Sequence, residues 1–298
     1  MIISIWHKFF KPPYGGGNQF LLALKNQLIK MGHNIEENNQ SGETSIINAL
    51  TFNLEDFKRA YKIKKTRIVH RIDGPMFLIR GFDKEKDDLC MKLNNEIADS
   101  TVLQSLWNYK KLTELGYHIN NPIIIYNAVD PQIFNRKDKH VFSNDRKIKI
   151  VSSSWSSNPR KGKDIYVWMD NNLDFNRFEY VFVGNVDAKF KNITVIPATG
   201  SVNLSRILKQ NDIYITASKN DPCSNALIEA LSCGLPSLYF NDGGHPELVR
   251  EGGLGFNEVD EIKEKLEMIV NNYNKFQDLI DVDNIDEVAE QYLEELTP

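Results

Sequence analysis

Two acidic residues, eight positions apart, flank the predicted start of a helix in the second half of the chain. Asp221 and Pro222 favour a turn, and Ser224 is a good N-cap for a helix that ends near Gly234. Asp221 then lies just outside the helix N-terminus, and Glu229 projects from the second turn. The first-turn N–H groups between them favour an anion. This order of groups suits a nucleotide sugar, with acceptors for sugar and ribose hydroxyls and donors for a diphosphate. A capped core helix with a satisfied Glu explains these residues equally well.

The residues that follow strengthen the first interpretation. Cys233-Gly234-Leu235-Pro236 leads into a predicted strand over 237–240, and Gly243-Gly244-His245-Pro246-Glu247 comes after it. The segment resembles the donor-site motif of family 4 retaining glycosyltransferases of GT-B architecture. That motif has a Glu, seven residues, a second Glu and a Cys-Gly-Leu-Pro-like turn, then Gly-Gly-x-Pro-Glu after the strand. The chain departs from it at Asp221, where the family usually has Glu.

The resemblance implies a role for each part of this segment. Glu229 would hold the ribose, and Asp221 would act on the transferred sugar as a catalytic residue. The turn and the helix start would supply further donor contacts through Cys223, Ser224, Asn225 and Ala226.

A triple glycine, Gly15-Gly16-Gly17, lies between the first predicted strand and the first predicted helix. Glycines there let the backbone approach a phosphate at the helix N-terminus, although a flexible loop is an equal alternative. The GxGxxG spacing of a dinucleotide fingerprint is absent. In the resembling family a Gly-Gly loop at this position packs over the donor diphosphate, which favours donor binding.

A basic loop, Arg160-Lys161-Gly162, precedes a predicted helix in the second half. Its two cations suit the neutralisation of a diphosphate leaving group, and we predict them as catalytic residues. The family pattern here is an Arg, a few residues, then Lys-Gly. Lys161 and Gly162 match it, but the position of the Arg falls near Ser156, and whether Arg160 replaces it is open. Without this context a solvated loop is the better interpretation.

His70 and Asp73 are the candidate catalytic residues of the first half. They come at the end of a predicted strand over 67–70, before a Gly74-Pro75 turn. His exchanges protons near neutrality, and Asp can orient a sugar hydroxyl, although each is more often a loop hydrogen-bonding group. The family frequently places a His at the end of this strand, near the donor sugar, and we carry that role to His70.

Three further residues are predicted to contact the donor. Val183-Gly184-Asn185 resembles the strand-end turn that the family has beneath the nucleotide, and Ile196 and Pro197 are candidates for contact with the base. Plain core and turn positions are the alternative for Ile196 and Pro197.

Other kinds of site lack support in the sequence. His7, His33, His245 and Glu247 have structural interpretations only. There is no HExxH pair or His cluster for a metal, and no Gly-x-Ser-x-Gly nucleophile motif. We therefore predict no metal site and no required cofactor, with a nucleoside diphosphate sugar as the donor substrate.

Size and charge limit the possible partners. The 298 residues, 41% of them hydrophobic, can form two domains. The net charge is −4, which argues against nucleic-acid binding, as no motif for it appears. A basic cluster could nevertheless rest on an anionic membrane or meet an acidic acceptor, although such a run is more often a solvated helix face. The cluster consists of Lys58, Arg59, Lys62, Lys64, Lys65 and Arg67.

The expected compartment follows from cysteine usage and from the absence of targeting segments. Cys90, Cys223 and Cys233 show no metal-ligand spacing and favour a reducing environment. No signal peptide or transmembrane stretch is visible. We expect a cytoplasmic protein, peripheral to a membrane if the basic cluster makes that contact.

Apolar strands alternate with amphipathic helices along the chain, which predicts an α/β fold. We expect two Rossmann-like doubly wound domains facing a cleft, the GT-B arrangement, with a shortened N-terminal domain. Residues 1–128 would form the acceptor-side domain, 129–275 the nucleotide-sugar domain, and 276–298 a helix that crosses back to the first. Predicted strands cover 2–5, 45–50, 67–70, 100–103, 123–126, 148–152, 180–183, 194–196, 213–216 and 237–240.

These features together predict a retaining, hexosyltransferase-type glycosyltransferase that moves a sugar from a nucleoside diphosphate to a hydroxyl of a glycan, lipid or small molecule. A nucleotide-sugar epimerase of the same architecture is one alternative. A non-catalytic nucleotide-sugar or glycan-binding protein is another, favoured by Asp221 in place of Glu and Ser156 in place of Arg.

Overall fold

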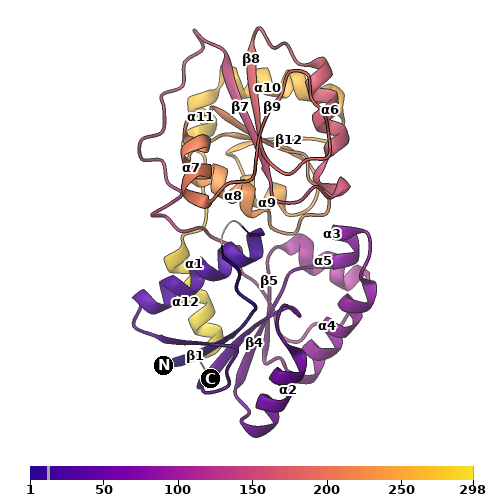
Figure 1. The fold of residues 1–298 in the computed structure, drawn as a ribbon, viewed down its shortest axis with the longest axis vertical. Helices are drawn as coiled ribbons and strands as arrows, with labels where there is room; N and C mark the ends of the chain where they lie inside the picture. Colours follow the sequence, from indigo (N-terminus) through magenta and orange to yellow (C-terminus); the bar gives the residue numbers. More distant parts are fainter. Residues whose placement is uncertain (12–13, 298) are drawn as a thin grey trace. The chain divides into compact units, whose positions relative to one another are not determined.

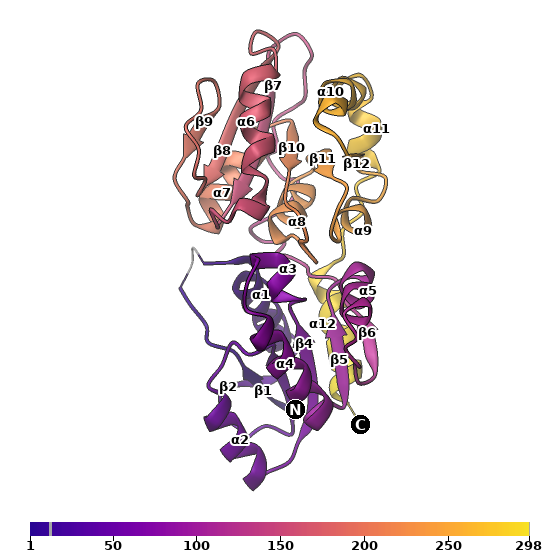
Figure 2. The ribbon, with the colours of Figure 1, turned by 90° about the vertical axis from the view of Figure 1, so that its right-hand side faces the viewer.

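The computed structural model describes residues 1–11 and 14–297 of the chain. The chain forms two compact units. Unit 1 comprises Met1–Phe10, Gly17–Ala128 and Asp283–Pro298, and unit 2 comprises Lys11–Gly16 and Val129–Val282. Figures 1 and 2 show a twisted sheet flanked by helices in each unit.

Unit 1 is built on a parallel sheet of six strands within the described residues, in the order β2-β1-β3-β4-β5-β6. The strands are β1 (Ile2–Trp6), β2 (Asn34–Glu37), β3 (Thr44–Asn48), β4 (Arg67–Ile72), β5 (Ser100–Leu103) and β6 (Pro122–Ile124). The order reverses between β1 and β3, as in other doubly wound sheets. His7, directly after β1, and Asn48, at the end of β3, therefore lie at this switch point.

Helices cover both faces of this sheet (Figures 1 and 2). One face is packed by α1 (Gly16–Lys30) and α12 (Ile285–Leu296), which share a core with Ile3, Ile46 and Val69. The other face carries α2 (Leu54–Ile63), α4 (Lys84–Ile97) and α5 (Leu106–Glu114). The short α3 (Met76–Arg80) precedes α4.

The last helix of the chain is part of unit 1. Its apolar face is buried through Ile285, Val288, Ala289, Tyr292 and Leu296. The preceding α11 (Tyr273–Asp278) belongs to unit 2, so the acidic tail is two helices separated by residues 279–284.

Half of the basic cluster, Lys58, Arg59 and Lys62, lies on α2, and the other half follows it. Asn53 caps this helix, because its side chain accepts from the backbone N–H groups of Glu55 and Asp56. Phe57 is buried, whereas Ile63, between Lys62 and Lys64, is 84% exposed. Contact with an anionic membrane stays a prediction. In the part of the chain that the structure describes, no helix is both long and apolar enough to span a bilayer.

Unit 2 also contains six parallel strands among its described residues, in the order β12-β11-β10-β7-β8-β9. The strands are β7 (Ile148–Ser154), β8 (Phe178–Gly184), β9 (Thr194–Ile196), β10 (Ile213–Thr216), β11 (Ser237–Phe240) and β12 (Gly253–Phe256). Numbered within the unit, this is the Rossmann order, which reverses between its first and fourth strands, here β7 and β10.

The helices of unit 2 bury a core around Ile150, Phe182 and Ile215. α6 (Lys163–Asn172), α10 (Ile262–Asn271) and α11 contribute to this core. α7 (Ser201–Lys209) packs on α8 (Asn225–Ser232), which lies on β10 and β11. The short helices η1 (Pro159–Lys161), α9 (His245–Val249) and η2 (Val259–Glu261) complete the unit.

The predicted α/β fold with two parallel sheets is confirmed. The predicted strands omit β2 and β12, which lie at the sheet edges. Their sequences, Asn-Ile-Glu-Glu and Gly-Leu-Gly-Phe, lack an apolar run. Edge strands lack a neighbour on one side, so less of their surface is buried and the apolar signal is weak.

We predict that Tyr292→Ala destabilises unit 1 by about 3–5 kcal/mol, because it empties a fully buried aromatic site between α12 and α1. Urea unfolding followed by circular dichroism measures the change. Glu290→Ala, on the exposed side of the same helix, is the control and should stay within about 0.5 kcal/mol of the parent. Equal stabilities of the two variants would contradict the packing of α12.

Candidate active site

In unit 2 the loops that carry reactive groups follow two neighbouring strands. β7 leads to η1, and β10 leads through residues 217–224 to α8. The two strands pair where the strand order of the sheet reverses. Ligands of open α/β sheets bind outside the carboxyl ends of the strands at such a point. The predicted donor residues Lys161, Asp221 and Glu229 therefore lie on elements that meet at one edge.

Lys161 and Asp221 form an ion pair, with 2.7 Å between Nζ and Oδ2. Burial raises the pKa of Asp221, but the positive charge of Lys161, the proximity of His245 and hydrogen bonds outweigh burial and hold this pKa below its usual value. The side chain of Lys161 is 32% exposed and that of Asp221 13%. The pair thus presents its cation to solvent, where an anion can approach.

The Lys-Gly turn is held in place by its backbone. Asn158 caps η1, since its Oδ1 accepts from the N–H of Arg160 at 2.9 Å. The carbonyl of Arg160 accepts from the N–H of Lys219 at 2.7 Å, which ties the turn to the segment after β10. Gly162 has φ +81°, and a Cβ there would lie 2.2 Å from the carbonyl oxygen of Ala217. Only glycine lets the two loops approach this closely.

Arg160 is half-buried, and its guanidinium has no hydrogen bond or ion pair within residues 1–11 and 14–297. Ser156, at the family's Arg position, makes local contacts: its Oγ accepts from the N–H of Asn158 at 3.2 Å. Arg160 is therefore the unpaired cation of this loop. Its replacement of the family's Arg stays a prediction.

Helix α8 starts as predicted, with Ser224 as its N-cap residue. The Ser224 side chain makes no capping hydrogen bond, although most N-cap serines do. The Ser224 hydroxyl therefore does not occupy the N–H groups of the first turn, the part of a helix that favours an anion. Cys223, just before the cap, is buried and forms no disulfide with the other described cysteines.

Glu229 is buried, with 7% of its surface exposed. Among the described residues, no group donates a hydrogen bond to its carboxylate. Burial raises the pKa of Glu229 to about 8. A buried carboxylate without donors is costly to a fold, so this position is explained better by a ligand that supplies hydroxyls than by packing.

The Gly243-Gly244 turn packs against the backbone of Asp221. The N–H of Gly244 donates to the carbonyl of Asp221 at 2.9 Å, and a Cβ on Gly243 would lie 2.2 Å from the same oxygen. His245, next in the chain, is fully buried, and its Nδ1 lies 3.0 Å from the carbonyl oxygen of Phe240. The sequence motif thus fixes the backbone that carries Asp221.

The remaining donor candidates end the strands on the other side of β7. Gly184 closes β8 with φ +120°, and a Cβ there would lie 1.9 Å from the carbonyl oxygen of Ser154. Ile196 ends β9 half-buried, and Pro197 after it is exposed. Contact of these residues with a nucleotide base stays a prediction.

The glycine loop divides between the two units. Gly16 groups with unit 2, and a Cβ on it would lie 2.4 Å from Nδ2 of Asn225, the first residue of α8. Gly15 likewise belongs to unit 2, while Gly17 belongs to unit 1. A side chain at Gly16 would displace Asn225, so the small residue is required there.

In unit 1, β4 extends to Ile72, and the prediction that the strand ends at His70 is wrong. Successive strand residues point to opposite faces, so His70 and Arg71 enter different cores. His70 is fully buried, with Nε2 3.1 Å from the carbonyl oxygen of Ala49 and Nδ1 3.3 Å from Asn94 Nδ2. Burial lowers the pKa of His70 to about 4. These contacts pack His70 against α4, and its catalytic role stays a prediction.

Asp73, just beyond β4, is held by a buried arginine that the sequence analysis did not single out. Arg71 is fully buried and donates through one guanidinium nitrogen to Asp73 Oδ1 at 2.5 Å and to Asn48 Oδ1 at 2.6 Å. Gln104 also donates to Asp73 Oδ1, at 3.1 Å. The other carboxylate oxygen has Asn48 Nδ2 at 3.5 Å. A charged residue directly before Ile72, in a run with the buried Ile68 and Val69, was the available signal for Arg71.

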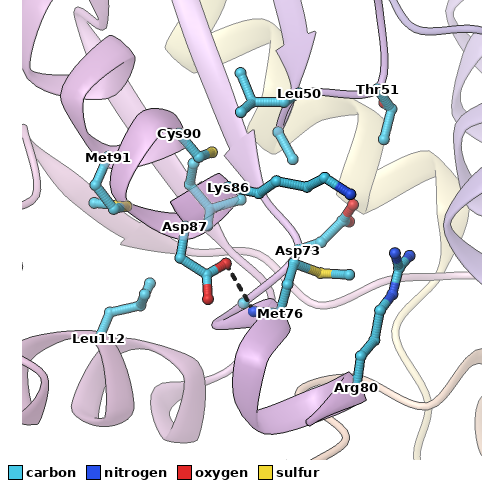
Figure 3. Close-up of a pocket in the computed structure, with 13 residues that line it drawn as sticks. Leu50, Thr51, Asp73, Met76, Arg80, Lys86, Asp87, Cys90, Met91 and Leu112 are labelled. Carbon is cyan, nitrogen blue, oxygen red and sulfur yellow. Dashed lines mark hydrogen bonds between the residues drawn. The ribbon is translucent and has the colours of Figure 1, made fainter. Parts of the chain in front are cut away.

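Asp73 lines a cavity of about 220 Å³ at the carboxyl edge of the unit 1 sheet (Figure 3). Asp87 forms part of its wall and fixes α3, because its carboxylate accepts from the N–H groups of Met76 and Phe77 at 2.8 and 3.0 Å. His70 is not among the lining residues. They are Ala49, Leu50, Thr51, Ile72, Asp73, Gly74, Met76, Arg80, Lys86, Asp87, Cys90, Met91 and Leu112.

Part of unit 2 matches a known family in sequence. Residues 187–282 match the model of the family described as "Glycosyl transferases group 1". This stretch contains Asp221, Glu229 and the Gly243-Gly244 turn. Over 66 residues the chain is 29% identical to spore coat protein SA of Bacillus subtilis (strain 168), a match that covers 22% of this chain and 18% of that protein.

The whole chain is similar in fold to solved glycosyltransferase structures. Sucrose-phosphate synthase from Thermosynechococcus elongatus superposes with a TM-score of 0.74 and 13% identity, over 98% of this chain and 97% of that one. HepE of Anabaena, in complex with UDP-glucose, superposes with a TM-score of 0.71 and 14% identity, over 99% of both chains. WaaG, a glycosyltransferase involved in lipopolysaccharide biosynthesis, superposes with a TM-score of 0.68 and 12% identity, over 100% of both chains. The predicted GT-B fold is thereby confirmed.

We predict that Arg71→Met destabilises unit 1 by about 3–5 kcal/mol, because it leaves the Asp73 carboxylate without its buried cation. Urea unfolding measures the loss. In the Arg71→Met/Asp73→Asn double variant the loss should be smaller than the sum of the single losses, since no uncompensated charge remains. Additive losses would show that the ion pair does not position Asp73.

Proposed function

We propose that the chain is a retaining glycosyltransferase that moves a sugar from a nucleoside diphosphate to a hydroxyl acceptor. One observation carries the proposal: a cation, an uncapped helix start and an unpaired buried carboxylate occur together at the switch point of the unit 2 sheet. The family match over residues 187–282 and the GT-B fold support a glycosyltransferase. Retention of the anomeric configuration, and membership of family 4, rest on the motif resemblance.

The donor site assigns each group of a nucleotide sugar to a different element. Glu229 accepts from the ribose hydroxyls, and Asp221 from a hydroxyl of the sugar. The diphosphate lies on the N–H groups of Ser224, Asn225 and Ala226, with Lys161 and Arg160 as counter-charges. The base lies near Gly184, Ile196 and Pro197, and the loop of Gly15, Gly16 and Gly17 covers the phosphates.

In the proposed reaction the bond between the anomeric carbon and the diphosphate oxygen breaks, and the diphosphate leaves with the electron pair. The acceptor oxygen bonds to the anomeric carbon, and its proton passes to an oxygen of the departing diphosphate. Lys161, Arg160 and the first turn of α8 stabilise the charge that develops on the leaving group. Asp73 orients the acceptor hydroxyl, while His70 supports the wall of the acceptor pocket through Ala49.

We propose a uridine diphosphate hexose as the donor, because HepE, which shares the fold, is in complex with UDP-glucose. A thermal-shift screen against uridine, guanosine and adenosine diphosphate sugars tests the base, since a bound ligand raises the melting temperature. Product analysis then tests the reaction. Transfer with retained configuration supports the proposal, whereas epimerised donor, or donor bound without turnover, would favour one of the alternative functions.

We predict that donor affinity rises with pH up to about 8, because the ribose hydroxyls need an ionised Glu229 as acceptor. Below that value each pH unit weakens UDP binding by up to about tenfold. Calorimetric titration with UDP at pH 6, 7 and 8 measures this, and in Glu229→Gln the binding should be weaker and independent of pH. A pH-independent affinity in the parent would count against the assignment.

The same carboxylate should make the free protein less stable at high pH. A carboxyl whose pKa is about 8 when folded and about 4.5 when unfolded stabilises the fold fully below pH 4.5 and loses that stabilisation towards pH 8. Glu229→Gln should therefore melt at a higher temperature than the parent at pH 8. A lower melting temperature would mean that Glu229 is a satisfied core residue.

We predict that Lys161→Ala lowers kcat by about 100-fold, because its charge matters most as the diphosphate departs. Steady-state kinetics of sugar transfer measure the effect. Lys163→Ala is the matched control, since Lys163 lies two positions further on and pairs with Asp187 at the surface. Equal rates in the two variants would remove Lys161 from the site.

A further inference from the structure

The loop after β7 carries one large apolar side chain among serines. Trp155 lies in the run Ser153-Ser154-Trp155-Ser156-Ser157, and 42% of its surface is exposed. Tyr14, in the segment Lys11–Gly16 that belongs to unit 2, is 41% exposed. The centroids of the two rings are 5.8 Å apart, with 47° between their planes. A lone exposed apolar side chain is common on protein surfaces, but two adjoining aromatic rings form an apolar patch on unit 2.

The backbone around Trp155 is fixed by the end of β8. Ser154, the last residue of β7, pairs with Gly184, the last residue of β8. The N–H of Asn185 donates to the carbonyl of Ser154 at 2.9 Å, and its Nδ2 donates to the carbonyl of Trp155 at 2.6 Å. Ser154 Oγ donates to the carbonyl of Ser156 at 2.7 Å. The indole therefore extends from a loop whose backbone is held by hydrogen bonds on both sides of it.

The position of Trp155 connects two parts of the proposed donor site. A Cβ on Gly15, in the loop proposed to cover the phosphates, would lie 3.8 Å from the indole Cδ1. The backbone of Trp155 is bonded to the residue after Gly184, the turn proposed to lie near the base. In a nucleotide the base is joined to the diphosphate through one ribose. A ring that adjoins both elements is therefore placed to meet the base.

The two rings offer a face to a ligand and no slot. At 5.8 Å and 47° they contact each other, so a third ring does not fit between them. The exposed part of the Trp155 indole is a flat apolar surface. Every nucleotide base has a π face that can stack on such a surface.

We propose that Trp155 stacks on the base of the nucleotide donor and that Tyr14 holds the indole in place. This inference rests on the proposed function, because it adds a residue to the base end of the same donor site. Stacking on a face does not read the hydrogen-bonding groups of a base. Trp155 therefore supplies affinity for the nucleotide, whereas the choice among bases falls to residues that contact the edge of the ring.

Calorimetric titration of the full chain with UDP tests the contact. Trp155→Leu keeps an apolar side chain but removes the flat ring, so UDP binding should weaken about tenfold, and Trp155→Phe should retain most of the affinity. Trp168→Leu removes an indole from α6 of the same unit and is the matched control, with UDP binding unchanged.

The outcomes separate the stacking from the proposed function. Equal UDP affinities of the parent and Trp155→Leu would overturn the stacking alone. A loss confined to UDP-glucose, with UDP binding unchanged, would also overturn it, because the indole would then contact the sugar. A parent that does not bind UDP would refute the proposed donor itself.

Tryptophan fluorescence provides a readout that a purely structural role of Trp155 would not change. Saturating UDP should quench part of the emission of the parent and of Trp168→Phe, and should leave the emission of Trp155→Phe unchanged. Quenching that persists in Trp155→Phe would place the base away from this ring.

A double-variant cycle tests the supporting role of Tyr14. Tyr14→Ala should weaken UDP binding in the parent and have no further effect in Trp155→Leu, because the tyrosine acts through the indole. Equal losses in the two backgrounds would contradict this role and give Tyr14 a separate contact with the nucleotide.

Discussion

The ion pair between Lys161 and Asp221 is the interaction around which the proposed donor site is organised. It joins the loops that follow β7 and β10, the two strands between which the order of the sheet reverses. Gly162 and the hydrogen bond from Lys219 to Arg160 bring these loops together. Within this ion pair each charge satisfies the other. A diphosphate and a sugar hydroxyl can replace these partners, so the proposed site is preorganised without leaving a buried charge unpaired.

The two units place opposite charges at their sheet edges. In unit 2 the cation Lys161 is the more exposed partner, and Asp221 lies deeper. In unit 1 the cation Arg71 is fully buried, and Asp73 is the partner that reaches the cavity. One edge therefore offers positive charge, which suits a diphosphate, and the other offers a carboxylate, which suits a hydroxyl. Both units have a parallel sheet with helices on its two faces. This architecture can carry either kind of charge, because the loops that follow the strands differ in sequence.

Much of the fold was readable from local pattern. The strands β5, β9, β10 and β11 have their predicted bounds and α8 has its predicted N-cap residue, since apolar runs and helix-capping residues mark them. The edge strands β2 and β12 were missed because an edge position does not require an apolar run. Asp221, Ser224 and Glu229 were identified from spacing on one helix and its turn, where local geometry is enough to place side chains. His70 was predicted at the end of its strand but lies within it, because β4 is two residues longer than predicted.

The sequence by itself determined the alternation of strands and helices, the order of the donor motif and the residue types that could bind an anion and hydroxyls. These are local properties, encoded in periodicity and spacing. Only the tertiary structure decided which of the neighbouring residues His70, Arg71 and Asp73 reaches a cavity, because the face of each depends on where the strand ends. It also decided that none of the described residues donates to the Glu229 carboxylate, whereas the Arg71 guanidinium finds several acceptors, because hydrogen bonds between distant segments exist only once the sheet is assembled.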